Sequence, residues 1–265
     1  MKHALMARII THLNAKESAY RIIDLHGGAG WYDLASQEAL RTGEWREGIG
    51  LLDAPLDAEA KLLLEPYRHA IAATRQLKGA SAYPGSPMIA SWLSRRQDRI
   101  IANEKHGETC AELRVAMSGE GRCRVLELDG SVALRANIPP RERRGLVLLD
   151  PPFERHDEFA ALVKDIVAAH EKWPQGIYAI WYPLKDHGLA DRFFGALTAR
   201  GLSRMLRLEM TVHQRDVGMG GSGLLVINPP WKLHDEARIL LPALVKRLAT
   251  GAGSHYRCEA ILPDG

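Results

Sequence analysis

Cysteine is scarce in this 265-residue sequence, which holds only Cys110, Cys123 and Cys258. The three are odd in number and far apart, and they form neither a CxxC pair nor the spacing of a zinc site. The pattern therefore indicates no disulfide framework, and we expect no metal cofactor. Unpaired thiols are typical of a reducing compartment, so we predict a cytoplasmic protein.

Long hydrophobic runs are also missing. No stretch approaches the roughly 18 apolar residues that a membrane-spanning helix needs, so we expect no membrane partner. The first residues lack the apolar core and the cleavage site of a signal peptide. They instead place Leu5, Ile9 and Leu13 on one face of an amphipathic helix.

Strong charge of one sign is absent as well. The formal net charge is +3 and the isoelectric point is near 8.8, a mild basic excess that permits a nucleic-acid partner without requiring one. The 46% hydrophobic and 25% charged content are those of a globular protein. The length suits one large domain, with or without an inserted subdomain.

The most informative segment that is present ends in Asp150-Pro151-Pro152-Phe153. Residues 145–149 form a short apolar run, typical of a buried parallel strand, and the two prolines end it. Ligands bind at the carboxyl ends of such strands. Asp150 and the Pro151 carbonyl can accept the two N–H bonds of an amino group on a flat ring, and Phe153 can stack on that ring. The alternative is an ordinary turn that leaves the strand.

A second segment has the same shape. Residues 224–227 are apolar and lead into Asn228-Pro229-Pro230-Trp231. Both segments cannot be the catalytic loop of one site. The first follows other cofactor-type signals in a sensible order, so we assign catalysis to Asp150, Pro151, Pro152 and Phe153. We expect the second segment to be a structural turn or a wall of the same site.

Strands alternate with helices along most of the chain, which predicts a mainly parallel sheet covered on both faces. The region 37–90 differs, because it contains helical patterns and no convincing strand. We therefore predict an α/β domain made of residues 1–36 and 91–265, with a helical insertion subdomain at 37–90. The predicted strands are residues 20–25, 98–104, 123–130, 145–149, 177–182, 205–212 and 223–227.

Acidic residues end three successive predicted strands. Glu104 is placed to take the hydroxyls of a cofactor ribose, Asp129 can accept from an adenine amino group, and Asp150 follows on the next strand. The first strand ends in a glycine-rich loop, in which Gly28 and Gly30 allow the backbone to approach a ligand closely. That loop is not a GxGxxG fingerprint, which disfavours a dehydrogenase.

This series of acids resembles that of class I, Rossmann-like, S-adenosylmethionine-dependent methyltransferases. Several further motifs make the sequence similar to the RlmJ family, whose members methylate N6 of an adenine in 23S ribosomal RNA. The resemblance runs from Lys2 to the end, and its motifs are residues 26–32, 41–45, 83–87, 144–153, 178–183 and 228–232. Family members begin with a further short segment, and usually carry Tyr where this chain has Phe153.

The resemblance implies S-adenosylmethionine as the cofactor and assigns its contacts residue by residue. Asp150 is implied to be catalytic as well as cofactor-contacting. The matching cofactor positions are His3, His26, Ser86, Glu104, Asp129, Gly130 and Asp150, to which the glycine loop adds Gly28 and Gly30.

RNA contacts are expected from basic side chains around the site, although a solvated surface explains any one of them equally well. Two other functions stay open: a guanine-N2 RNA methyltransferase, and a non-catalytic RNA-binding protein that lacks the amino-terminal segment. We expect a monomer acting on 23S ribosomal RNA. The candidate RNA-binding residues are Arg95, Arg96, Arg141, Arg143, Arg144 and Lys232.

Overall fold

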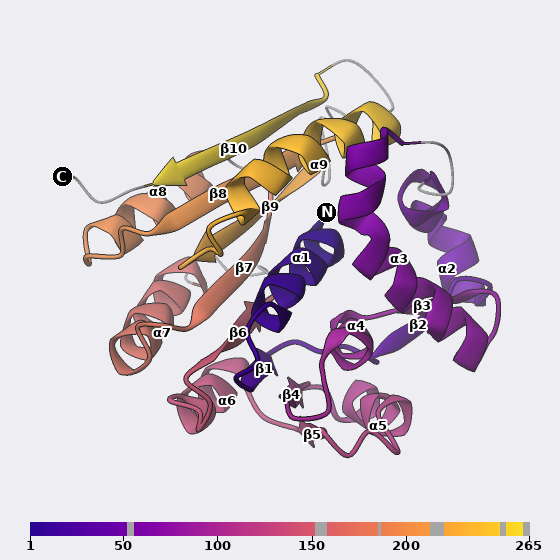
Figure 1. The fold of residues 1–265 in the computed structure, drawn as a ribbon, viewed down its shortest axis with the longest axis horizontal. Helices are drawn as coiled ribbons and strands as arrows, with labels where there is room; N and C mark the ends of the chain where they lie inside the picture. The colour runs from indigo at the N-terminus through magenta and orange to yellow at the C-terminus, as the bar shows by residue number, and fades with distance from the viewer. Residues whose placement is uncertain (52–55, 152–157, 185–186, 213–219, 250–252, 262–265) are drawn as a thin grey trace.

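The protein is built on one twisted sheet with helices packed on both faces (Figure 1). A computed structural model describes residues 1–51, 56–151, 158–184, 187–212, 220–249 and 253–261. The sheet order is β10-β8-β9-β7-β6-β1-β4-β5. Its strands are β1 (Tyr20–Asp24), β4 (Arg99–Asn103), β5 (Cys123–Leu126), β6 (Arg144–Leu149), β7 (Ile177–Pro183), β8 (Met205–Thr211), β9 (Gly221–Ile227) and β10 (His255–Ile261).

The parallel part of the sheet has its switch point between β1 and β6. From β1 the chain passes outward to β4 and β5, then returns to place β6 and β7 on the other side of β1, with all these neighbours parallel. β9 is antiparallel to both β7 and β8. The prediction of a mainly parallel sheet is confirmed, and ligands of such folds bind beside the switch point.

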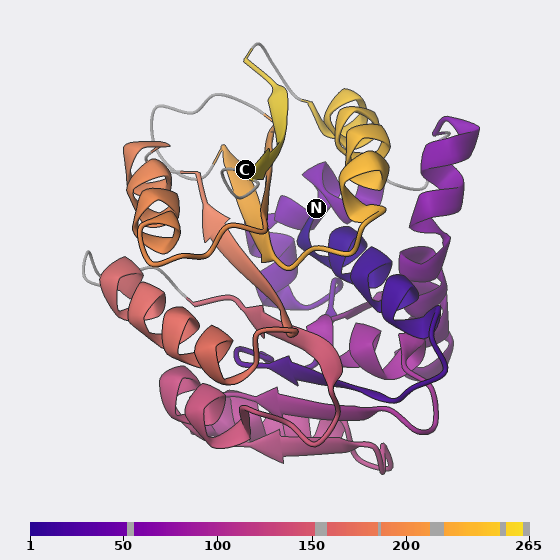
Figure 2. The ribbon, with the colours of Figure 1, turned by 60° about the vertical axis from the view of Figure 1, so that its left-hand side comes forward.

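Helices cover both faces of the sheet (Figure 2). Each face has its own hydrophobic cluster between the sheet and its helices. One face carries α6 (Gly130–Asn137), α7 (Glu158–Lys172) and α8 (His187–Thr198). The other carries α1 (Lys2–Asn14), α3 (Ala58–Lys78), α4 (Ser86–Leu93) and α9 (Leu233–Leu248), with α5 (Gly107–Ala116) near β5. Central strands covered on both faces explain why their sequences are almost continuously apolar.

The region 37–90 contains α2 (Gln37–Thr42), two 3-10 turns at Glu44–Glu47 and Ile49–Leu51, and the long helix α3. The expectation that it holds no strand is wrong. β3 (Ala82–Pro84) pairs with β2 (Trp31–Asp33) in a separate antiparallel ribbon. Strands of three residues are too short to give a readable alternation. α3 packs Leu64 and Ile71 into the same hydrophobic cluster as α1. The division of the chain into a main domain and a separate insertion subdomain at 37–90 stays a prediction.

Two further differences concern the end of β5 and two elements that were not predicted. The strand predicted at 123–130 stops at Leu126, because Asp129 is the N-cap of α6 and accepts from the Ser131 N–H at 3.0 Å. The sequence analysis made no prediction for α9 or β10, although the apolar residues of α9 recur at helical spacing. The predicted neighbours β8 and β9 do pair, as expected. Among the helices of the described part of the chain, none is long and apolar enough to cross a bilayer.

Candidate active site

Four carboxylates follow the carboxyl ends of four adjacent strands. Across the sheet their order is Asp129 after β5, Glu104 after β4, Asp24 at the end of β1, and Asp150 after β6. The switch point lies between Asp24 and Asp150. Three of these acids were expected at one edge, and the structure brings them together there. Of the predicted catalytic loop, Asp150 and Pro151 are half-buried, whereas Pro152 and Phe153 lie outside the described residues.

His26 connects the loop after β1 to the loop after β6. Its Nδ1 accepts the backbone N–H of Asp150 at 3.1 Å, and its own backbone N–H donates to Oδ1 of Asp24 at 3.2 Å. Nδ1 must therefore be unprotonated, which agrees with burial lowering the pKa of His26. On the other side, a Cβ on Gly130 would lie 2.9 Å from Nε2 of His26, so only glycine allows this approach.

The glycine loop has the backbone that its sequence requires. Gly28 and Gly30 have φ of +59° and +83°, in the region that glycine occupies without strain. A Cβ on Gly28 would also lie only 2.2 Å from the Tyr32 hydroxyl. The Gly28 N–H donates to Oε2 of Glu104 at 3.0 Å, which joins the loop to β4. These contacts hold the loop close against the carboxylate edge.

Glu104 is buried and held by two backbone donors, Gly28 N–H on one oxygen and His106 N–H on the other at 2.9 Å. Each oxygen keeps a lone pair for a further donor. Asp129 is more exposed, and the Lys105 ammonium, 3.1 Å from Oδ2, lowers the pKa of its carboxyl. Both carboxylates are therefore fixed in direction and can still accept hydrogen bonds from a ligand.

Asp24 is fully buried, and that burial raises its pKa to about 6. The neighbouring Ser86 hydroxyl and Lys2 ammonium lower the pKa in part. Ser86 is the first residue of α4 and is buried. Oδ2 of Asp24 is buried without a hydrogen-bond partner among the described residues. Since buried polar atoms are normally paired, this oxygen marks a place where a ligand donor would fit.

Lys2 was not predicted as a site residue. Its ammonium forms an ion pair with Oδ2 of Asp150, with both side chains about one-fifth exposed. The next residue, His3, is tied to the region 37–90, because its Nδ1 lies 2.8 Å from the Tyr83 hydroxyl. That hydroxyl lies 2.8 Å from the hydroxyl of Tyr67. Burial lowers the pKa of His3 well below its usual range.

A buried asparagine was also missed. Nδ2 of Asn103 donates to the carbonyls of Leu25 and Leu128 at 3.0 and 2.9 Å, and its Oδ1 accepts the Leu128 N–H at 3.1 Å. It thereby joins the ends of β1, β4 and β5. The signal in the sequence was a polar residue that closes an apolar strand, one position before Glu104.

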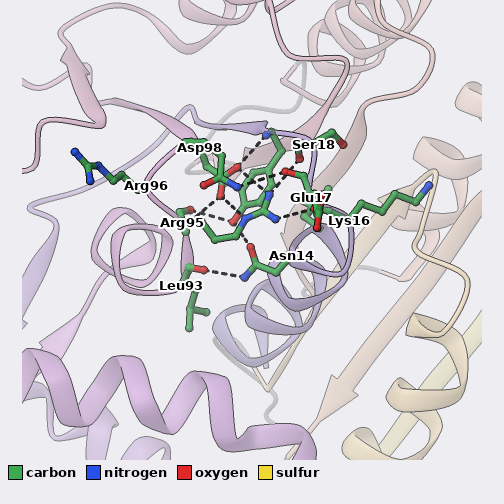
Figure 3. Close-up of polar contacts among 12 residues, drawn as sticks. Asn14, Lys16, Glu17, Ser18, Leu93, Arg95, Arg96 and Asp98 are labelled. Atoms are coloured by element: carbon green, nitrogen blue, oxygen red, sulfur yellow. Dashed lines mark hydrogen bonds and ion pairs between the residues drawn. The ribbon is translucent and has the colours of Figure 1, made fainter.

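The candidate RNA-binding arginines do not lie with Asp150. Arg95 precedes β4, and Arg141, Arg143 and Arg144 are at or just before the start of β6, so they occupy the opposite, amino-terminal edge. The Arg95 guanidinium donates to the carboxylate of Asp98 and to main-chain carbonyls, whereas Arg96 extends away (Figure 3). The Arg144 guanidinium donates to the carbonyls of Leu13 and Ser18 at 2.7 and 3.0 Å.

The segment Asn228-Pro229-Pro230-Trp231 lies at that same opposite edge. β9 is antiparallel to β7 and pairs Ile227 with Tyr178, near the start of β7. Asn228 has φ of +54°, and its Nδ2 donates to the carbonyls of Pro174 and Gly176 at 2.8 Å each. It is therefore a structural turn, and the alternative that it forms a wall of the same site is wrong. The Lys232 ammonium lies over the Trp231 ring, 4.9 Å from its centroid.

The doubly wound sheet, with a glycine loop and acids at its switch point, defines a Rossmann-like α/β protein. The family model described as RsmJ, "Ribosomal RNA large subunit methyltransferase D, RlmJ", matches residues 17–261. The chain therefore belongs to this family of methyltransferases, which confirms the family resemblance, the class I fold and the prediction of an enzyme.

Individual relatives agree with the family model. Ribosomal RNA large subunit methyltransferase J of Escherichia coli (strain K12) is 36% identical over all of this chain and 94% of its own length. The protein of the same name from Haemophilus influenzae is also 36% identical, with the same coverage. Protein LPL1258 from Legionella pneumophila, a solved structure, superposes with a TM-score of 0.86 and 30% identity, over 98% of this chain and 95% of its own.

Proposed function

We propose that this protein transfers a methyl group from S-adenosylmethionine to N6 of an adenine in 23S ribosomal RNA. The observation that carries the proposal is the position of Asp150 and Pro151. They lie directly beside the switch point, and His26 joins them to the glycine loop by a hydrogen bond. Family membership and the names of the two bacterial relatives support ribosomal RNA as the substrate. We also propose that the enzyme acts as a cytoplasmic monomer that needs no metal ion.

The residues at the carboxylate edge fit S-adenosylmethionine. The unpartnered, buried Oδ2 of Asp24 suits a donor such as the cofactor's ammonium group. Glu104 would accept the two ribose hydroxyls, and Asp129 would accept from the adenine amino group. His3, His26, Gly28, Gly30, Ser86 and Gly130 would complete the binding surface. When bound, the cofactor supplies a methyl group on a sulfonium centre.

Asp150 and Pro151 would act on the target adenine. The base would be flipped out of the RNA and stacked on Phe153. Lys2 binds Oδ2 of Asp150, so the amino group would use Oδ1 and the Pro151 carbonyl. Accepting both N–H bonds draws the nitrogen lone pair out of conjugation, and Asp150 takes the proton released on transfer. Rate enhancement then comes mainly from orientation and fixed charge.

The test is to identify the methylated nucleoside. Purified protein is incubated with 23S ribosomal RNA made in vitro and with isotopically labelled S-adenosylmethionine, and the RNA is digested to nucleosides. We expect label in N6-methyladenosine for the wild type and none for Asp150→Ala. Label in N2-methylguanosine would replace the proposal with the guanine-N2 alternative. No label, together with no calorimetric binding of the cofactor, would favour a non-catalytic RNA-binding protein.

A further inference from the structure

Three arginines share one face of the sheet, at the ends of the strands far from Asp150. Arg21 and Arg99 are direct neighbours in the pairing of β1 with β4, and Arg124 pairs with Ile101, two residues beyond Arg99. Side chains alternate along a strand, so all three arginines are on the face that carries Ile23 and Ile101. Neighbouring strands are about 4.8 Å apart, which groups three guanidinium stems closely.

These arginines line a hollow of about 240 Å³, together with Arg122. The remaining lining residues are Ile100, Ile101, Gly121 and Cys123, so no acidic side chain of the described residues lines it. Arginine presents its N–H donors in a planar fork, the geometry that matches phosphate oxygens. The Arg122 guanidinium is already bonded to Glu120 and to the main-chain carbonyls of Ser91 and Ser94, so the donors that can meet a ligand come from the other arginines. The arrangement therefore points to an anionic ligand.

Two of the four arginines have carboxylate partners. Arg21 forms a two-pronged pair with Glu142, and Arg122 is paired with Glu120. Arg99 is exposed and donates through Nη1 to the main-chain carbonyls of Arg96 and Asp98. Those carbonyls do not neutralise its charge.

Of the four arginines, Arg124 has the fewest contacts with polar groups. It is exposed, and in the part of the chain that the structure describes it has no hydrogen-bond or ion-pair partner. Arg99 and Arg124 therefore leave two positive charges uncompensated at the hollow. Charged residues on an edge strand alone would discourage strand pairing. Here the arginines come from three adjacent strands, so protection of the β5 edge does not account for them.

The same edge of the molecule is basic beyond the hollow. Arg96, Arg141 and Arg143 are exposed there, in the segments that lead into β4 and β6. Arg96 points away from the Arg95–Asp98 cluster and into solvent (Figure 3). Exposed arginines thus extend along this edge beyond the hollow, which suits an extended polyanion better than a single small ion.

We propose that the hollow lined by Arg21, Arg99, Arg122 and Arg124 binds the phosphate backbone of the RNA substrate through Arg99 and Arg124. This inference rests on the proposed function. Arg144 and Asp150 are six steps apart along the chain, about 20 Å at roughly 3.3 Å per residue, so the hollow contacts RNA remote from the target adenine. It gives affinity and position through phosphates rather than through the base that is methylated.

The experiment measures RNA affinity as a function of salt for Arg99→Glu/Arg124→Glu. The matched control is Lys61→Glu/Arg238→Glu, the same charge change at exposed positions of α3 and α9. With a long 23S ribosomal RNA fragment, we expect the hollow variant to bind at least tenfold more weakly. The slope of log K against log[salt] should become shallower by about 1.5 to 2, the loss of two phosphate contacts. The control should keep the wild-type slope.

Two measurements separate the possible failures. Arg99→Glu/Arg124→Glu should bind S-adenosylmethionine as tightly as the wild type and should melt at the same temperature. A second hollow variant, Arg124→Ala, removes one charge without reversing it, at a side chain without a described partner. An unchanged salt slope in both hollow variants, with adenine methylation intact in the wild type, would overturn this inference alone. A shallower slope with no methylation by the wild type would leave the RNA surface standing and remove the proposed function.

Discussion

The backbone N–H of Asp150 donates to Nδ1 of His26 across 3.1 Å. The loop after β6 is thereby fastened to the glycine loop after β1, although 124 residues separate the two. The ring of the same histidine lies so close to the start of α6 that a Cβ on Gly130 would be 2.9 Å from its Nε2. His26 therefore determines where the Asp150 carboxylate stands relative to the cofactor-type residues.

Replacing His26 by Ala should slow methyl transfer about 10- to 100-fold, because displacement of a reacting group by about 1 Å is that costly. Single-turnover rates with saturating cofactor measure this effect. His26→Asn is the control, since its side-chain oxygen can accept the Asp150 N–H and should restore part of the rate. A His26→Ala rate within twofold of the wild type would show that the contact does not position Asp150.

Gly28→Ala should weaken binding of S-adenosylmethionine at least tenfold. The new methyl group would have to displace the Tyr32 hydroxyl, which lies 2.2 Å from its position, and the residue must also keep a positive φ. Gly119→Ala is a matched control, because Gly119 has φ of +83° and nothing within 4 Å of its Cβ position. Both variants should lose about 1 kcal/mol of stability. Equal cofactor affinity in calorimetric titrations of the two variants would contradict the prediction.

Asp24→Asn should become more stable relative to the wild type as the pH rises. The folded-state pKa of Asp24 is about 6, above its ordinary value of 3.8, so the group's contribution is favourable in acid and is lost as the pH rises through about 6. Between pH 4 and pH 8, the difference in unfolding free energy should move by about 2 kcal/mol in favour of the variant.

Urea unfolding of Asp24→Asn and wild type, without cofactor, checks that change across the pH range. If the difference in unfolding free energy between Asp24→Asn and the wild type did not change with pH, burial would not raise the pKa of Asp24. The same variant should bind S-adenosylmethionine more weakly, because the unpartnered acceptor of Asp24 loses its charge.

Glu236→Gln should destabilise the protein by about 3 kcal/mol at neutral pH, the usual cost of breaking a buried ion pair. Arg8 donates to both Glu236 oxygens at 2.9 and 2.7 Å, and His12 lies 3.0 Å from one of them. Burial opposes ionisation, yet these contacts hold the pKa of Glu236 at about 2.

Since this pKa lies below the ordinary 4.5, the stabilisation is complete above pH 4.5 and is lost as the pH falls towards 2. Urea unfolding at pH 7 and pH 3 should show the gap to Glu236→Gln narrowing in acid. Asp235→Asn, at an exposed neighbour, should change stability by less than about 0.5 kcal/mol. A Glu236→Gln variant as stable as Asp235→Asn would contradict the prediction.

The sequence predicted the parallel strands well because central strands are apolar throughout and end in punctuating residues. It located Glu104, Asp129 and Asp150 because the carboxyl ends of parallel strands meet at one edge of the sheet, where ligands bind. β10 escaped prediction because most of its residues are exposed, on both sides of the strand, so it lacks an apolar alternation.

Local sequence patterns could not predict contacts between residues far apart in the chain. Lys2 meets Asp150 across 148 residues, and only the packing of α1 against the sheet brings them together. At Arg95 and Arg144, the sequence identifies a positive charge but does not indicate where the guanidinium group points. Both guanidinium groups donate to main-chain carbonyls of residues 13–18, and that of Arg95 also donates to the Asp98 carboxylate, which no composition rule can indicate.

The most direct test of the account compares methyl transfer with cofactor binding in Asp150→Ala. Asp150 is proposed to hold the target amino group, so the transfer rate to 23S ribosomal RNA should fall by at least 100-fold. The dissociation constant for S-adenosylmethionine, measured by calorimetry, should change by less than about tenfold. Turnover equal to that of the wild type would contradict the assignment of Asp150 as the catalytic residue.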